Sequence, residues 1–202
     1  MPTDDLSEAA GAVDGSLAPV GKVLLDRERL HRTLVRMAHE IAEHDPDVGA
    51  MALVGIQRRG VEIAQRLASH LEEFYGARPA TGAIDITFYR DDLDNRGPAF
   101  DQPVVHSTSL PFDVQDRRIV LVDDVLFTGR TIRAAVEALF DYGRPAAVQL
   151  AVLVDRGHRE LPIRPDFVGK NVPTSRTERV NVSLEEIDGR DEVTLEHPPD
   201  TR

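Results

Sequence analysis

The sequence predicts an α/β protein in which a parallel sheet is flanked by helices and carries a small cap or hood. Three short apolar runs, at 50–56, 118–124 and 148–154, have the length and composition of strands buried on both faces. Segments long enough for helices alternate with these runs. Such alternation implies crossover helices between neighbouring strands, and therefore parallel pairing.

The first helix is expected to begin after Asp26, whose carboxylate suits an N-cap, and to run to about His44. Its apolar residues recur at the spacing that places them on one buried face. These residues are Leu30, Leu34, Met37 and Ile41. A second helix is expected over 61–75 and a strand over 82–88.

A third helix is expected over 131–142, where Gly143 and Pro145 end it. Residues 90–113 are polar and contain Gly and Pro, so we expect a long loop without a core of its own. This loop is either a variable surface segment or a lid that excludes water from a reactive intermediate.

Charge divides the chain into three parts. Of the net charge of −11, residues 1–20 contribute −4 and residues 184–202 contribute −5, which leaves −2 for residues 21–183. We expect 1–20 to be a disordered acidic tail and 21–183 to form one domain with the cap at about 156–183. Residues 184–202 are expected to be a mostly acidic C-terminal extension.

The composition favours a cytoplasmic protein without a membrane partner. The absence of cysteine excludes disulfides, a cysteine nucleophile and thiolate metal sites. The N-terminal residues are acidic and lack the pattern of a signal peptide. No apolar run approaches the roughly 18 residues that a membrane span requires.

The segment 119–131 has the features of a phosphate-binding loop. An apolar strand leads through a short loop into a helix, whose N-terminus offers free N–H groups and partial positive charge to an anion. Gly129 allows the backbone to approach that anion, and the hydroxyls of Thr128 and Thr131 add donors. The segment matches neither a P-loop nor a dinucleotide fingerprint.

Two adjacent acids, Asp123 and Asp124, end the strand of this segment. Carboxylates repel a phosphate but accept hydrogen bonds from hydroxyl groups, so they suit the ribose of a sugar phosphate. Ligands of open α/β sheets gather at the carboxyl ends of the strands. The alternative is a plain helix cap followed by ordinary loop acids, which the order of strand, acids, loop and helix disfavours.

Residues 119–131 resemble the motif of type I phosphoribosyltransferases that binds 5-phosphoribosyl-1-pyrophosphate (PRPP). Residues 54–60 resemble the pyrophosphate loop of that family, and residues 85–92 resemble the start of its flexible loop. The resemblance implies a Rossmann-like fold and a catalytic role for Asp123 and Asp124. It also implies a set of PRPP-binding residues. These are Arg58, Arg59, Arg90, Asp123, Asp124, Val125, Leu126, Phe127, Thr128, Gly129, Arg130 and Thr131.

Residues 150–164 and 168–175 are similar to the base-binding cap of the PyrR family, and the resemblance spans about 22–193. It implies a bifunctional pyrimidine-operon regulator that converts uracil and PRPP to UMP and pyrophosphate. Arg156 and the backbone near Val180 would face uracil. Mg²⁺ would be held through PRPP and water, with no cage of protein ligands. The resemblance also implies a homo-oligomer.

Two segments are basic: 27–39 and 156–179 each carry +3 apart from histidines. On charge alone, ordinary solvated surfaces are the better interpretation, since no aromatic stacking platform accompanies them. The PyrR resemblance favours binding of the pyrimidine-operon (pyr) leader mRNA, strengthened by UMP or UTP. It implicates Arg36, His39, His158, Arg159, Arg164 and Lys170. Val35 departs from the threonine common in that family, which removes one hydroxyl donor.

Two other functions stay open. One is a salvage enzyme for uracil or a purine base, without RNA regulation. The other is a regulator whose site only senses nucleotides, which the complete set of pyrophosphate-loop and PRPP-loop residues disfavours.

Overall fold

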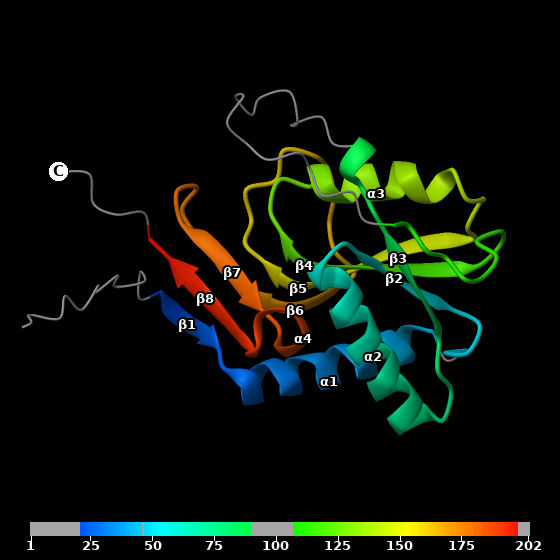
Figure 1. Cartoon of the computed structure of the whole chain (residues 1–202), viewed down its shortest axis with the longest axis horizontal. Coiled ribbons are helices and arrows are strands. Elements are labelled where there is room, and N and C mark those ends of the chain that lie inside the picture. The colour runs from blue at the N-terminus through cyan, green and yellow to red at the C-terminus, as the bar shows by residue number, and fades with distance from the viewer. Residues whose placement is uncertain (1–20, 46, 90–106, 198–202) are drawn as a thin grey trace, which may run out of the picture.

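A five-stranded parallel sheet forms the centre of the protein in the computed structural model, which describes residues 21–45, 47–89 and 107–197. The strand order is β3-β2-β4-β5-β6, and every neighbouring pair is parallel (Figure 1). The strands are β2 (Ala52–Ile56), β3 (Ala80–Ile84), β4 (Arg118–Leu126), β5 (Ala147–Asp155) and β6 (Phe167–Asn171). The predicted α/β fold with a parallel sheet is confirmed.

Helices cover both faces of this sheet. α1 (Arg27–His44) and α2 (Arg59–Tyr75) pack on one face, and α3 (Arg130–Phe140) packs on the other (Figure 1). All five residues of β2 are buried, as a strand between two helical layers requires. The side chain of Asp26 caps α1 by accepting a hydrogen bond of 2.8 Å from the Arg29 N–H. The four apolar residues predicted for its inner face are buried.

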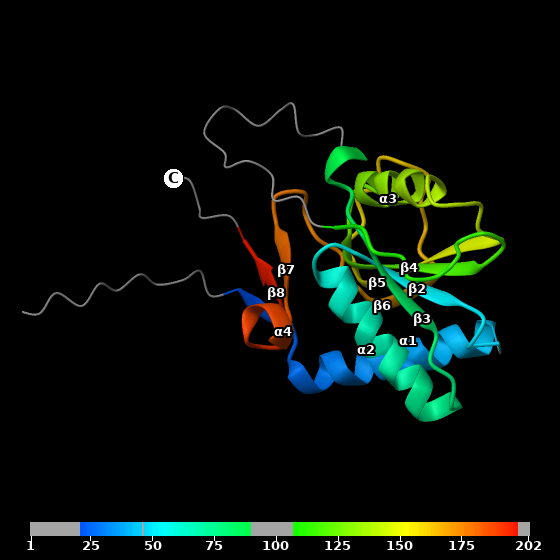
Figure 2. The ribbon, with the colours of Figure 1, turned by 45° about the vertical axis from the view of Figure 1, so that its right-hand side comes forward.

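A second, antiparallel sheet joins the N-terminal part of the described chain to its C-terminal part. Its order is β1-β8-β7, formed by β1 (Lys22–Leu25), β7 (Arg179–Ser183) and β8 (Glu192–Glu196). The short helix α4 (Glu185–Asp188) connects β7 to β8. We call these three strands and α4 the hood, which lies to one side of the main sheet (Figures 1 and 2).

The structure divides the C-terminal third differently from the predicted boundaries. β6 lies within the predicted cap at 156–183 but joins the main sheet beside β5. β8 lies beyond residue 183 and pairs with both β1 and β7, so residues 184–197 are part of the hood. Arg66 of α2 pairs with two acids of this segment, Glu186 and Asp191. The acidic composition therefore reflects ion pairs that hold a folded element.

The strand predicted over 82–88 is shorter than expected. β3 ends at Ile84, and the 3₁₀ turn η1 (Thr87–Tyr89) follows. The Asp85 carboxylate causes this ending, because it accepts hydrogen bonds from the N–H and the hydroxyl of Thr87, at 2.9 and 2.6 Å.

Some predictions fall on residues that the structure does not describe. They are the acidic tail at 1–20, most of the loop at 90–113 and Arg90. Within the ranges that are described, no helix is both long and apolar enough to cross a membrane.

Two glycines let α2 begin directly against the sheet. A Cβ atom on Gly55 of β2 would lie 2.3 Å from the Cα atom of Val61. A Cβ atom on Gly60 would lie 2.3 Å from the carbonyl oxygen of Val122 in β4. Neither position has room for a side chain, so these contacts fix residues 57–60 beside the end of β4.

The Gly60→Ala substitution is expected to lower the free energy of unfolding by about 1–3 kcal/mol, because the added methyl group must push α2 away from β4. Urea unfolding followed by circular dichroism measures this change. Gly49→Ala is the matched control, since the nearest heavy atom to its added Cβ is 3.8 Å away. Equal stability of the two variants would contradict the close contact.

Candidate active site

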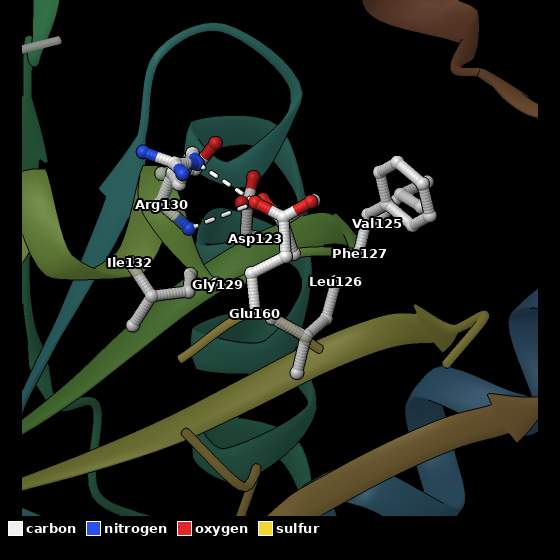
Figure 3. A pocket seen from close by; sticks show the side chains of 10 residues that line it. Asp123, Val125, Leu126, Phe127, Gly129, Arg130, Ile132 and Glu160 are labelled. Atoms are coloured by element: carbon white, nitrogen blue, oxygen red, sulfur yellow. Dashed lines mark hydrogen bonds and ion pairs between the residues drawn. The ribbon is translucent and has the colours of Figure 1, made fainter. Parts of the chain in front are cut away.

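The loop between β4 and α3 forms one wall of a cavity of about 360 Å³. Gly129 adopts the left-handed conformation, with φ of 95°, directly before the first turn of α3. The Arg130 N–H lies 3.4 Å from the Thr128 hydroxyl oxygen. Figure 3 shows the side chains around this cavity. The lining residues are Asp123, Val125, Leu126, Phe127, Thr128, Gly129, Arg130, Thr131, Ile132 and Glu160.

A second cavity, also of about 360 Å³, adjoins the first and shares Asp123, Val125 and Thr131 with it. The expected pyrophosphate loop forms one side of it. The remaining lining residues are Ile56, Gln57, Arg58, Arg59, Asp85, Ile86, Thr87 and Asp124. The parallel register of β2 and β4 places these two loops at the same end of the sheet. Residues about 65 positions apart in the sequence therefore line one continuous site.

The two adjacent aspartates lie where the cavities meet. Asp123 is only 6% exposed and lines both cavities, whereas Asp124 lines the second. Each carboxylate accepts a hydrogen bond from the next backbone N–H, Asp123 from Asp124 at 2.9 Å and Asp124 from Val125 at 2.8 Å. Burial raises the pKa of Asp124, although the Val125 N–H and the charge of Arg59 favour its ionised form.

Metal binding by protein side chains alone finds no support in the described residues, where no group of three or more His, Asp or Glu side chains can hold an ion. Asp85, Asp123 and Asp124 nevertheless give the second cavity carboxylate oxygens on two sides. Oxygen ligands of this kind suit Mg²⁺, which retains water and uses substrate phosphates. The site therefore fits a magnesium ion that arrives with a phosphorylated substrate.

Arg156, one of the two residues expected to face the base, joins the end of β5 to the loop that leads into β7. It is 7% exposed, and its Nη2 group donates to the carbonyl oxygens of Ser175 and Glu178, at 2.9 and 2.7 Å. Its guanidinium also lies 4.2 Å from the ring centroid of Phe127, which lines the first cavity. The other residue, Val180, is half-buried in β7.

The fold brings the two basic segments together. Arg36 of α1 donates to the carbonyl oxygens of Val168 and Gly169 in β6, at 3.0 and 2.5 Å. β6 is the edge strand of the main sheet, and α1 packs against it. The residues that sequence reasoning grouped as RNA contacts therefore include two neighbours at this edge, Arg36 and Lys170.

The six expected RNA-contact residues differ in what they bind. Arg159 donates to the carbonyl oxygens of Phe127 and Ile163, and His158 is 2.6 Å from the carbonyl oxygen of Thr174. Tyr75 holds His39 through a hydrogen bond of 2.8 Å to its Nδ1 atom. Arg164 is exposed and Lys170 half-exposed, and neither makes a side-chain hydrogen bond or ion pair to another described residue.

Glu160 and Asp188 are site residues that sequence reasoning missed. Glu160 lines the phosphate-loop cavity, where its Oε2 atom lies 3.0 Å from Nε of Arg130 (Figure 3). Its backbone N–H also donates to the Thr128 carbonyl oxygen at 2.9 Å. Asp188 pairs with Arg59. No spacing in the sequence signals these contacts, since each joins loops that only the folded chain brings together.

Comparison with known proteins identifies the family to which the chain belongs. The phosphoribosyl transferase domain family matches residues 22–186. The bifunctional protein PyrR of Roseiflexus sp. strain RS-1 is 61% identical over 168 residues, which cover 83% of this chain and 90% of that protein. The protein of the same name from Deinococcus radiodurans is 52% identical over 177 residues, covering 88% of this chain and 95% of that protein.

Solved structures show the same fold. The hypoxanthine phosphoribosyltransferase of Trypanosoma cruzi matches with a TM-score of 0.63 at 17% identity, over 88% of this chain and 97% of that chain. The hypoxanthine phosphoribosyltransferase of Staphylococcus aureus gives a TM-score of 0.64 at 17% identity, over 90% and 94%. Since more than half of the residues are identical to PyrR proteins over most of the chain, the protein belongs to the phosphoribosyltransferase family and, within it, to the PyrR proteins.

Proposed function

We propose that this protein transfers the phosphoribosyl group of PRPP to uracil, yielding UMP and pyrophosphate, and that it binds pyr leader mRNA in response to UMP or UTP. In this proposal Mg²⁺ enters the site with PRPP. The protein acts in the cytoplasm and forms a homo-oligomer.

One observation carries the enzymatic part: two adjoining cavities share Asp123, with a phosphate loop on one side and paired arginines on the other. PRPP has the same order of groups, a 5′-phosphate, a ribose and a pyrophosphate. The phosphate fits against Thr128 and Gly129 at the start of α3. The ribose hydroxyls then meet Asp123 and Asp124.

In the reaction, the bond from ribose C1 to pyrophosphate breaks, a bond from C1 to uracil N1 forms, and the N1 proton of uracil is released to water. Positive charge develops on the ribose and negative charge on the leaving group. The two aspartates stabilise the sugar side, and Arg58 and Arg59 bind the pyrophosphate, because a guanidinium presents a fixed fork of donors to phosphate oxygens. The protein accelerates transfer chiefly by positioning and charge.

When magnesium is bound, it neutralises charge on the pyrophosphate. Asp85, Asp123 and Asp124 would hold it, through water and the substrate, from the second cavity. For uracil we propose the Nη1 group of Arg156, which makes no hydrogen bond to any described residue, and main-chain groups near Val180. Arg90 remains assigned to the pyrophosphate by resemblance.

Support for RNA binding comes from Arg164 and Lys170, whose charges no described acid neutralises. Arg36 and Arg159 instead bind carbonyl oxygens and pair with Glu40 and Asp155, so we propose that they shape the RNA surface more than they charge it. The hydrogen bonds of Arg159 and Glu160 to Phe127 and Thr128 link this surface to the phosphate loop. This link supports control of RNA binding by a nucleotide in the site.

The alternative function is salvage of a base without RNA regulation. The internal hydrogen bonds of Arg36 and Arg159 favour it, because they give both residues a structural role that needs no RNA. A purine substrate is not supported by the likeness to hypoxanthine enzymes, which at 17% identity shows the fold alone.

Asp123→Asn combined with Asp124→Asn is expected to reduce uracil-dependent release of pyrophosphate from PRPP at least about 100-fold, because the neutral amides cannot stabilise the developing positive charge. Steady-state assays of the purified protein measure this loss. Turnover unchanged from wild type would refute the assignment.

A stability measurement on the second substitution alone tests the environment of Asp124. Because burial raises the pKa of Asp124 and so disfavours its charged form, Asp124→Asn alone should raise the free energy of unfolding at neutral pH. This gain should shrink as the pH falls through the raised pKa and vanish below about pH 4, where the carboxyl is protonated in both states. A variant destabilised at pH 7 would contradict the buried environment.

Lys170→Ala and Arg164→Ala should each weaken binding of pyr leader RNA by removing a phosphate contact, and should reduce the slope of log affinity against log salt by about one. Gel-shift titrations with and without UMP measure both effects. Uracil transfer should be unaffected, since neither residue lines the two cavities of the active site. An RNA complex that is indifferent to both substitutions would contradict this contact surface, and the absence of any complex with wild type would favour the salvage-only function.

A further inference from the structure

An ion pair links the pyrophosphate loop to the hood. The Asp188 carboxylate of α4 accepts hydrogen bonds from one edge of the Arg59 guanidinium, 2.9 Å from Nη2 to Oδ1 and 3.3 Å from Nε to Oδ2. Arg59 is the first residue of α2 and lines the second cavity. The contact therefore joins the residue expected to hold pyrophosphate to an element 129 positions away in the sequence.

Asp188 is itself held in place. Its Oδ2 atom accepts a hydrogen bond of 2.9 Å from the Leu184 N–H. Burial alone would favour the neutral acid, but this N–H and the nearby Arg59 charge hold the pKa of Asp188 below its ordinary value. The hood presents an ionised, fixed carboxylate to Arg59 at neutral pH.

The rest of α4 is fastened to α2 by a separate set of contacts. Arg66 donates to Glu186 at 2.6 Å and to Asp191 at 2.7 Å. This segment is therefore attached to α2 by ion pairs that do not involve Asp188.

The geometry of the ion pair between Asp188 and Arg59 indicates its role. Asp188 occupies the Nε and Nη2 edge of the guanidinium, while Nη1 makes no hydrogen bond to a described residue. The carboxylates of Asp85, Asp123 and Asp124 line the same cavity as Arg59. Without a partner behind it, a flexible arginine would fold onto these acids and present no free edge to a phosphate.

We propose that Asp188 is a positioning residue for phosphoribosyl transfer: it holds Arg59 from the hood so that the Nη1 edge faces the leaving pyrophosphate. This role rests on the proposed function, in which Arg59 binds pyrophosphate. Asp188 holds the planar guanidinium of Arg59 in one orientation, so that Arg59 loses less conformational freedom when the substrate binds.

The test compares Asp188→Asn with Glu186→Gln, which removes one of the two acids that hold Arg66 and leaves Arg59 untouched. Asp188→Asn should raise the KM for PRPP and weaken binding of magnesium pyrophosphate in calorimetry, each about tenfold, as expected for a lost charge-assisted hydrogen bond. Asp188→Glu should recover part of this loss, and Glu186→Gln should match wild type in both measurements.

A double-mutant cycle separates positioning from simple support of the fold. In an Arg59→Ala background, Asp188→Asn should cause no further loss, because there is no guanidinium left to position. A further loss of similar size in that background, or wild-type pyrophosphate affinity in Asp188→Asn alone, would overturn the proposal.

Calorimetry of magnesium pyrophosphate binding also tests the role of Asp188 separately from the transfer reaction. A wild-type protein that binds magnesium pyrophosphate but releases none from PRPP and uracil would refute the transfer reaction, and the Asp188 comparison would still decide the role of that residue. A wild-type protein that does not bind magnesium pyrophosphate would overturn the role of Asp188 as well.

Discussion

The contact between Gly60 and the Val122 carbonyl oxygen is the constraint on which the site depends. A Cβ atom at residue 60 would lie 2.3 Å from that oxygen, so α2 can start this close to β4 only because residue 60 has no side chain. The pyrophosphate loop precedes this contact and the paired aspartates directly follow Val122. The absence of a side chain at residue 60 therefore allows arginines after β2 and carboxylates of β4 to line one cavity, where their charges act on the same ligand.

Ion pairs between the hood and α2 also hold the arginines near the site in place. Acids of residues 184–191 bind arginines of α2, and Asp188 reaches Arg59 at the edge of the cavity. An acidic segment beside a site for a polyanion would repel the substrate if its charges were free. Because these carboxylates are paired with arginines, they instead orient the cationic groups that the substrate meets.

Arginines of the basic segments stabilise the fold by donating hydrogen bonds to backbone carbonyl oxygens. Arg156 joins the end of β5 to the loop before β7, Arg36 binds the edge strand β6, and Arg159 binds the phosphate loop. Buried carbonyl oxygens need donors, and a guanidinium supplies several at once. A nucleotide in the phosphate loop and an RNA on the basic surface would thus act on segments joined by direct hydrogen bonds.

The sequence by itself determined the parallel α/β core, the capped first helix and the phosphate loop, because these depend on local periodicity and on residues within 13 positions of one another. Only the tertiary structure decided that β6 joins the main sheet, that the acidic segment 184–197 completes the hood, and that Glu160 and Asp188 reach the site. Each of these contacts joins residues far apart in the chain or in separate loops. Such pairings leave no periodic pattern, since they are selected by packing and charge in the folded protein.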